Sequence, residues 1–197
     1  MFGTKMKELS LNILDVAENS VKAGATLTQI LLTERGNVLT LEIVDDGCGM
    51  SADVVRSVID PFYTTRTTRK VGMGIPLLKL ACEQTGGNLA ISSVTQEDDP
   101  VNHGTHVTAT FYTDHIDFTP LGDVSASILT LIQGHPDTDF LFRHERNGRA
   151  VELDTRELRE VLEDVPLNSY DVMEWIGGNL QEQYEELSGE DGHNGED

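Results

Sequence analysis

The chain has 197 residues, of which 38% are hydrophobic and 24% are charged. This composition suits one packed domain, with or without a small appendage, and argues against global disorder. The formal net charge of −20 repels phosphate backbones and anionic lipid, so we expect neither nucleic acid nor a membrane to be a partner.

The sequence lacks other signals that would direct the protein elsewhere. Its two cysteines, Cys48 and Cys82, are too few for a disulfide scaffold, and their spacing is not that of a metal site. The first residues have no apolar core of a secretion signal. No segment approaches the roughly 20 apolar residues of a membrane-spanning helix. We therefore expect a cytoplasmic location.

The first 113 residues predict elements in the order α-β-β-α-loop-α-β-β. Helical spacing of apolar residues, stopped by Gly24, predicts a first helix over 5–23. Two strand patterns around a turn at Gly36-Asn37 predict a hairpin. The expected ranges are helices over 51–59 and 75–85, strands over 27–34, 38–45, 88–94 and 105–113, and a polar loop over 62–74. This order predicts an α+β fold, a two-layer α/β sandwich with helices on one face of the sheet.

From about residue 114 the pattern predicts a further αββαα unit. Its expected elements are helices over 123–134, 155–163 and 169–187 and a hairpin of 138–145 and 149–154. We therefore divide the chain into a domain over 1–113, an appendage over 114–186 that either packs on the first unit or forms a separate subdomain, and an acidic disordered tail over 187–197. Seven acidic residues and no Lys or Arg lie between residues 182 and 197.

Two segments of the first half combine carboxylates with polar or glycine neighbours. Asp15 and Asn19 are four residues apart and share one helical face, where they suit a water molecule and a magnesium ion, or simply form a polar solvent face. Asp45 ends a strand and is followed by Gly47 and Gly49. These glycines allow a flat ligand to approach, with the carboxylate accepting from an exocyclic amine, although an acidic tight turn uses the same residues.

Two further segments carry hydroxyls, cations and glycines. Arg66, Arg69 and Lys70 gather in a chain that is otherwise poor in cations, just before Gly72-Met73-Gly74. A helix that starts at these glycines offers backbone N–H groups to an anion, and the alternative is a solvated basic loop. A dinucleotide-binding motif would need a third glycine and a preceding strand. Gly104-Thr105 opens a strand and by itself indicates only a strand start.

In this order and spacing the four segments resemble the N box, the two glycine boxes with their lid, and the final Gly-Thr strand of the GHKL superfamily. The resemblance covers about residues 9–111 and is closest to histidine kinase catalytic domains, on DPFYTTR and VGMGIPLLKLACEQTGGNLAISS. The whole chain also resembles stand-alone kinase-like ATP-binding proteins associated with iron-only hydrogenases.

The resemblance implies a Bergerat fold that binds ATP and Mg²⁺. It implies that Asn19 ligates the metal and that Asp45 binds the adenine amine between Gly47 and Gly49. Arg66, with Arg69 or Lys70, would meet the triphosphate, as would the backbone of Gly72, Met73 and Gly74. Thr105 would support a water bound to adenine.

The sequence departs from the family in two ways. Hydrolysing members have Glu as general base where this chain has the shorter Asp15, and no His precedes the N box as phosphoacceptor. The pair His144-Glu145 is interpreted as structural. We therefore expect a kinase that acts in trans on a separate protein partner, the alternatives being a nucleotide-dependent regulatory switch or a slow ATPase that uses Asp15.

Overall fold

The computed structural model describes residues 8–59 and 73–188. Within these ranges the strands are β1 (Leu27–Arg35), β2 (Val38–Asp45), β3 (Asn88–Val94), β4 (Gly104–Tyr112), β5 (Asp139–Arg146) and β6 (Arg149–Asp154). The helices are α1 (Leu9–Lys22), α2 (Ala52–Ile59), α3 (Gly74–Glu83), α4 (Val124–Gly134), α5 (Thr155–Leu162) and α6 (Tyr170–Ser188). The predicted order of elements is confirmed for the described residues.

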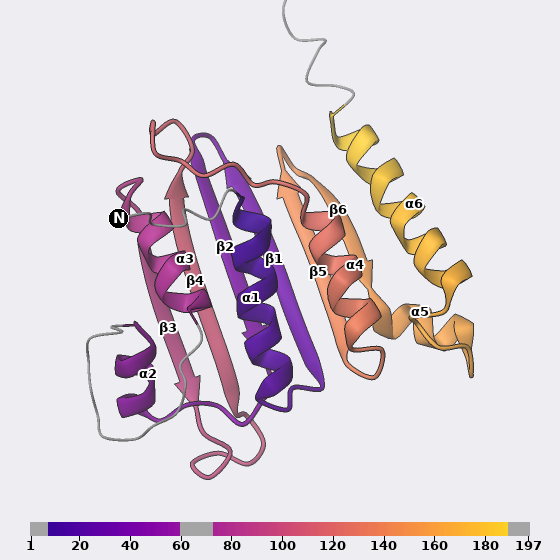
Figure 1. The fold of residues 1–197 in the computed structure, drawn as a ribbon, viewed down its shortest axis with the longest axis horizontal. Coiled ribbons are helices and arrows are strands. Elements are labelled where there is room, and N and C mark those ends of the chain that lie inside the picture. Colours follow the sequence, from indigo (N-terminus) through magenta and orange to yellow (C-terminus); the bar gives the residue numbers. More distant parts are fainter. Residues whose placement is uncertain (1–7, 60–72, 189–197) are drawn as a thin grey trace, which may run out of the picture.

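The strands form one mixed sheet in the order β3-β4-β2-β1-β5-β6. Neighbouring strands are antiparallel except β1 and β5, which run parallel. Figure 1 shows α1, α3 and α4 side by side over the same face of this sheet. The predicted α+β architecture with helices on one face is therefore confirmed.

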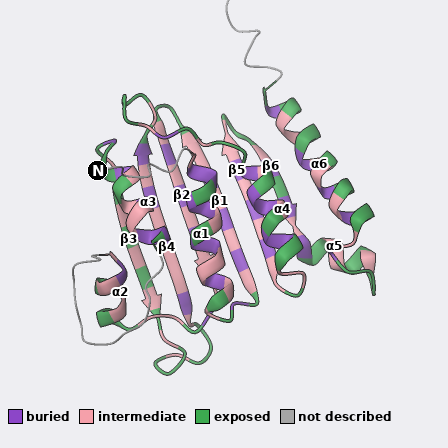
Figure 2. Ribbon diagram, viewed as in Figure 1, coloured by how far each residue is buried: buried purple, intermediate pink, exposed green. Residues whose placement is uncertain are grey.

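Alternating burial along the strands explains why one face is covered. In β2, Leu39, Leu41 and Ile43 are at most 2% exposed, whereas the residues between them are half-buried. Ile13 and Val16 of α1 are equally buried and belong to the same core. Figure 2 shows this alternation as bands along the strands. Each such side chain contributes about 1.5–3 kcal/mol on burial, so the helix layer and the sheet stabilise each other.

The second half of the chain extends the sheet of the first. β5 pairs with β1 from Leu27 opposite Asp139 onward. The linker before α4 also meets the start of α1, where Leu9 N–H donates to the carbonyl of Pro120 and Ser10 N–H to that of Leu121. These bonds satisfy N–H groups that the first turn of a helix leaves free. Of the two arrangements left open, the structure has the appendage packed on the first unit, while the division into domains at residue 113 stays a prediction.

Most element boundaries lie within two residues of the predicted ones. Ser51 Oγ accepts from Val54 N–H at 3.4 Å, and Asp154 accepts from Arg156 N–H at 3.0 Å, so these side chains cap the starts of α2 and α5. The part of the first helix predicted over residues 5–7, and the tail beyond 188, lie outside the described residues. No helix within the described ranges is long and apolar enough to cross a membrane.

Candidate functional site

The two carboxylates at the end of β2 have different surroundings. Asp46 accepts hydrogen bonds from the N–H and the hydroxyl of Thr26 and from Leu27 N–H. Partial burial acts to raise the pKa of Asp46, but these hydrogen bonds outweigh it and hold the pKa below its ordinary value. Asp46 therefore fastens the start of β1 to the end of β2, and its role is structural.

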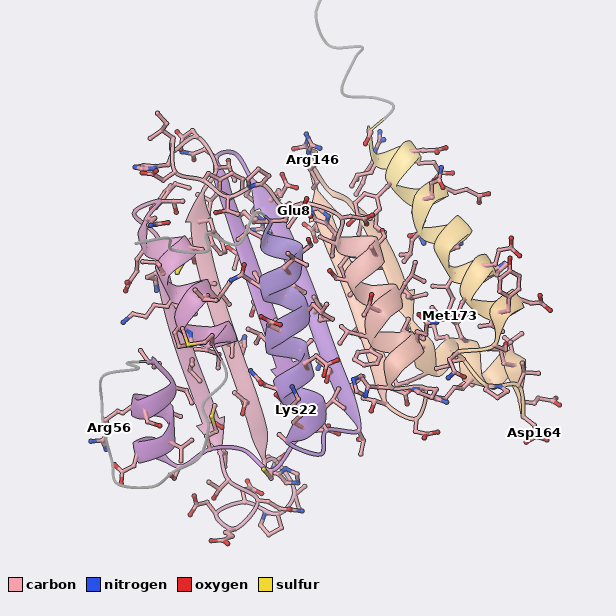
Figure 3. The ribbon with its side chains drawn as sticks, viewed as in Figure 1. Glu8, Lys22, Arg56, Arg146, Asp164 and Met173 are labelled. Carbon is pink, nitrogen blue, oxygen red and sulfur yellow. The ribbon has the colours of Figure 1, made fainter. Side chains whose placement is uncertain are left out.

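Asp45 lies on the helix-covered face, under the C-terminal end of α1. Its Oδ2 accepts a hydrogen bond of 2.7 Å from the hydroxyl of Ser20, and its Oδ1 accepts one of 3.0 Å from Gly47 N–H. Figure 3 labels Lys22, the last residue of α1, at this end of the sheet. These two hydrogen bonds hold the carboxylate of Asp45 in one orientation. Because each carboxylate oxygen can accept twice, lone pairs remain for a ligand.

The glycine-containing turn after Asp45 is tied to its surroundings by backbone groups. Cys48 N–H donates to the carbonyl of Ala23 at 2.9 Å, and Cys48 C=O accepts from Gln96 N–H at 3.0 Å. The ring nitrogen Nδ1 of His103 donates to the carbonyl of Gly47 at 2.6 Å. The turn that contains Gly47 and Gly49 is thus fixed against both α1 and the β3–β4 connection.

Thr105 is the cross-strand partner of Asp45, and Ser93 is the cross-strand partner of Thr105. Side chains in such positions share one face of a sheet and lie close together. The hydroxyls of Ser93 and Thr105 are 2.9 Å apart. Ser93 Oγ also accepts from Met50 N–H at 2.8 Å and donates to Gly104 C=O at 2.9 Å. The structure therefore brings Asp45 and Thr105 together and adds Ser93 to them.

Asp15 and Asn19 lie on the side of α1 that faces α3. Asp15 is exposed and Asn19 half-buried, and within the described residues neither side chain makes a hydrogen bond. A Cβ atom on Gly74, the first residue of α3, would lie 3.1 Å from Cβ of Asp15. The absence of a side chain at Gly74 therefore lets the start of α3, where N–H groups are free, approach Asp15 closely. Met73 precedes that start and is 59% exposed.

The remaining predicted phosphate-binding residues, Arg66, Arg69, Lys70 and Gly72, lie outside the described residues. Among the described residues there is no group of three or more His, Cys, Asp or Glu side chains that would hold a metal ion. A side-chain amide oxygen such as that of Asn19 can bind a cation together with phosphate oxygens and water. This fits magnesium, which binds proteins through one or two side chains together with substrate phosphates and water.

Several polar residues of the site escaped the sequence analysis. Ser20 and Ser93 were missed because a serine in a helix or strand carries no pattern of its own. Two buried polar groups also lack partners within the described residues: Thr28 Oγ1, on the strand position opposite Asp45, and both amide atoms of Asn12, one turn before Asp15 on α1. Only tertiary contacts could have revealed them.

The pair His144-Glu145 lies away from this site. The imidazole of His144 is buried and lies 2.8 Å from Glu34 Oε1 and 2.9 Å from the hydroxyl of Tyr184. These bonds join β5, β1 and α6. The arrangement agrees with the structural interpretation of His144.

The comparisons with known proteins agree on one family. The family model described as "Histidine kinase-, DNA gyrase B-, and HSP90-like ATPase" matches residues 5–115. Sensor protein KdpD of Clostridium acetobutylicum is 30% identical over 94 residues, which are 45% of this chain and 10% of that protein. Sporulation kinase B of Bacillus subtilis is 24% identical over 98 residues, 50% of this chain and 23% of that protein. The chain thus spans less than a quarter of either relative.

A solved structure agrees with the fold. The N-terminal domain of a DNA repair protein superposes with a TM-score of 0.54 and 17% identity, covering 77% of this chain and 54% of that one. At this identity the match shows the fold alone. The family match, in contrast, spans more than half of the chain and contains every predicted site residue. The chain therefore belongs to the histidine kinase-, DNA gyrase B- and HSP90-like ATPases, the GHKL superfamily, and its first half is an ATP-binding domain of this kind.

Proposed function

We propose that the protein binds Mg-ATP between α1, the start of α3 and the strand ends at Asp45 and Thr105, and transfers the γ-phosphoryl group to a side chain of a separate protein. The observation that carries the nucleotide site is the fixed orientation of Asp45. Ser20 and Gly47 each occupy one lone pair of its carboxylate and leave others for the exocyclic amine of adenine.

The protein groups at the phosphate end of the proposed site favour ligands of opposite charge. The free N–H groups at the start of α3 favour an anion, whereas Asp15 is an exposed carboxylate beside them. A magnesium ion held by Asn19 would supply positive charge beside both Asp15 and the phosphates. Asn19 is the proposed protein ligand, because its side-chain amide oxygen accepts no hydrogen bond within the described residues and Asn19 lies one turn from Asp15. Arg66, Arg69, Lys70 and the backbone of Gly72 and Gly74 are proposed to meet the triphosphate.

The proposal of a kinase rests on the relatives and on the chemistry. Two matched relatives are named as a sensor protein and a sporulation kinase. Phosphoryl transfer depends on alignment and charge stabilisation more than on covalent chemistry by the protein. The partner would supply the phosphoacceptor, and the unit from α4 to α6 is the proposed docking surface.

A slow ATPase is the second candidate function, favoured by the exposed position of Asp15 next to α3. In that case Asp15 would act as general base toward a water molecule. A nucleotide switch would bind Mg-ATP with neither transfer nor hydrolysis.

The first experiment measures ADP and ATP affinity by calorimetry in the wild type and in Asp45→Asn. Asparagine offers one acceptor oxygen where the carboxylate offers two, so we expect affinity to fall at least about tenfold. The matched control is Asp46→Asn, which removes a carboxylate that accepts from Thr26 and Leu27. This control should lower thermal stability and leave affinity unchanged. Equal affinity in Asp45→Asn and the wild type would overturn the site.

The second experiment follows γ-labelled Mg-ATP. Label on a co-purified or candidate partner supports the kinase, and steady phosphate release by the pure protein supports the ATPase. Release that stops in Asp15→Asn but continues in Glu18→Gln would assign Asp15 as the base, since Glu18 on the same helix is paired with His135 and Lys22. Binding without label or release supports the switch.

A further inference from the structure

Ser93 Oγ has three polar neighbours at hydrogen-bond distance and only one proton. They are Met50 N at 2.8 Å, Gly104 O at 2.9 Å and Thr105 Oγ1 at 2.9 Å. A backbone N–H can only donate and a carbonyl can only accept. Met50 therefore donates to Ser93, and Ser93 can bond to Gly104 only by donating its own proton.

This count fixes the direction of the third bond. If Ser93 gave its proton to Thr105 instead, the oxygens of Ser93 and Gly104 would face each other at 2.9 Å with no hydrogen between them. All three contacts are hydrogen bonds only when Thr105 is the donor to Ser93. The hydroxyl proton of Thr105 then points across the sheet from β4 to Ser93 on β3, and Thr105 offers only lone pairs to the rest of the site.

Asp45, on the other side of Thr105, is also an acceptor. Its two oxygens receive hydrogen bonds from Ser20 and Gly47 and have no proton to give as a carboxylate. Asp45 on β2 and Thr105 on β4 therefore both offer acceptors toward the proposed position of the base. An amino group can donate one N–H to each of these two acceptors, whereas a keto oxygen would be repelled by their lone pairs and by the charge of Asp45.

We infer that Ser93 is a specificity-determining positioning residue: by holding the Thr105 hydroxyl as an acceptor, it selects purines with a 6-amino group over purines with a 6-keto group. This inference rests on the proposed nucleotide site. It adds that discrimination belongs to the Ser93–Thr105 pair as well as to Asp45. In Ser93→Ala the Thr105 hydroxyl can rotate, donate to a keto oxygen, and so relax the selection.

The test compares ADP with IDP, whose base has a keto group in place of the amine, by calorimetry on the full chain. The readout is the ratio of the ADP affinity to the IDP affinity. Asp45 contributes equally to this ratio in wild type and variant, so a difference between them reports on Ser93. Loss of one hydrogen-bond preference should lower the ratio about tenfold in Ser93→Ala. Ser93→Thr keeps the hydroxyl and should show the affinity ratio of the wild type. The matched control is Ser92→Ala, an exposed serine on the opposite face of β3, which should leave the ratio unchanged.

A double variant separates this role from a purely structural one. In Thr105→Val there is no hydroxyl to orient. The double variant with Ser93→Ala should therefore have the same affinity ratio as Thr105→Val alone. Should Ser93→Ala fail to fold, Ser93→Cys retains the volume with a weaker donor and should also lower the ratio. An unchanged ratio in a folded Ser93→Ala would overturn the inference and leave the nucleotide site intact. Failure of the wild type to bind ADP at all would overturn the proposed function itself.

Discussion

The hydroxyl of Ser20 lies 2.7 Å from Oδ2 of Asp45, although 25 residues separate them along the chain. This bond joins α1 to the end of β2. Since α1 also carries Asp15 and Asn19, a single contact relates the proposed phosphate end of the site to the proposed adenine end. The contact is shielded, because Ser20 is only 3% exposed.

Removing the Ser20 hydroxyl should weaken nucleotide binding. A hydrogen bond to a charged group contributes about 1.5–3 kcal/mol, so we expect Ser20→Ala to lower ADP affinity at least about tenfold. Ser127→Ala is the control, since Ser127 is a buried helical serine that donates to the carbonyl of Ser10, away from the site. It should reduce thermal stability and keep ADP affinity. Calorimetry on both variants checks the prediction, and equal losses of affinity would contradict it.

Alanine should have opposite effects at two glycines. Gly104 has φ +134°, and a Cβ there would lie 1.9 Å from the carbonyl oxygen of Asp45. Backbone strain and overpacking together predict a loss of about 2–5 kcal/mol in the free energy of unfolding of Gly104→Ala. Gly178 is exposed in the middle of α6 with nothing within 4 Å of such a Cβ. Gly178→Ala should gain up to about 1 kcal/mol. Urea denaturation measures both, and a stabilised Gly104→Ala would refute the steric argument.

Acid should destabilise the fold partly through Glu34. The hydrogen bond from buried His144 lowers the pKa of Glu34 from its ordinary 4.5 and outweighs burial, which raises it. A carboxyl whose folded-state pKa is lowered stabilises the fold above its ordinary pKa, and this contribution is lost as pH falls through the folded value. The wild type should therefore lose stability below about pH 4.5, and Glu34→Gln should lose less over the same interval. Asp46 and Asp154, whose pKa values are also lowered, should keep part of the dependence.

Urea titrations at pH 7, 5 and 3 measure this difference. The variant is expected to be less stable than the wild type at pH 7, because the buried imidazole of His144 loses a charged partner. Parallel pH profiles for the two proteins would show that Glu34 makes no such contribution.

The two cysteines should differ sharply in reactivity. Cys48 is exposed, whereas Cys82 is buried in α3, and burial raises the pKa of its thiol to about 11. Because the thiolate is the nucleophile, iodoacetamide at pH 8 should alkylate Cys48 and spare Cys82 until the protein is unfolded. Mass mapping of the labelled peptides, with and without denaturant, distinguishes the two sites. Native Cys82 that reacts as fast as Cys48 would contradict the burial.

Local patterns were sufficient for most of the secondary structure. The helix over Leu9–Lys22 and the hairpin of β1 and β2 were predictable because apolar period, turn residues and caps act over a few neighbouring positions. The order of Asp15, Asn19, Asp45, Gly74 and Thr105 likewise pointed to the family that residues 5–115 match. The bounds of α3 and α6 differ from the predicted ones by one or two residues, because helix ends fray and local patterns do not define the terminal residue.

Only the tertiary structure decided that β5 lies parallel to β1 in the same sheet, since no local signal encodes which distant strand edges pair. The same holds for Ser20, whose partner Asp45 is 25 residues away, and for Ser93, whose partners are 11 to 43 residues away. The sequence by itself determined which residues can form helices, strands and turns, and which polar groups are available. The fold decided which of those groups meet, because a hydrogen bond needs two atoms at one place and direction, and that placement follows from the packing of the whole chain.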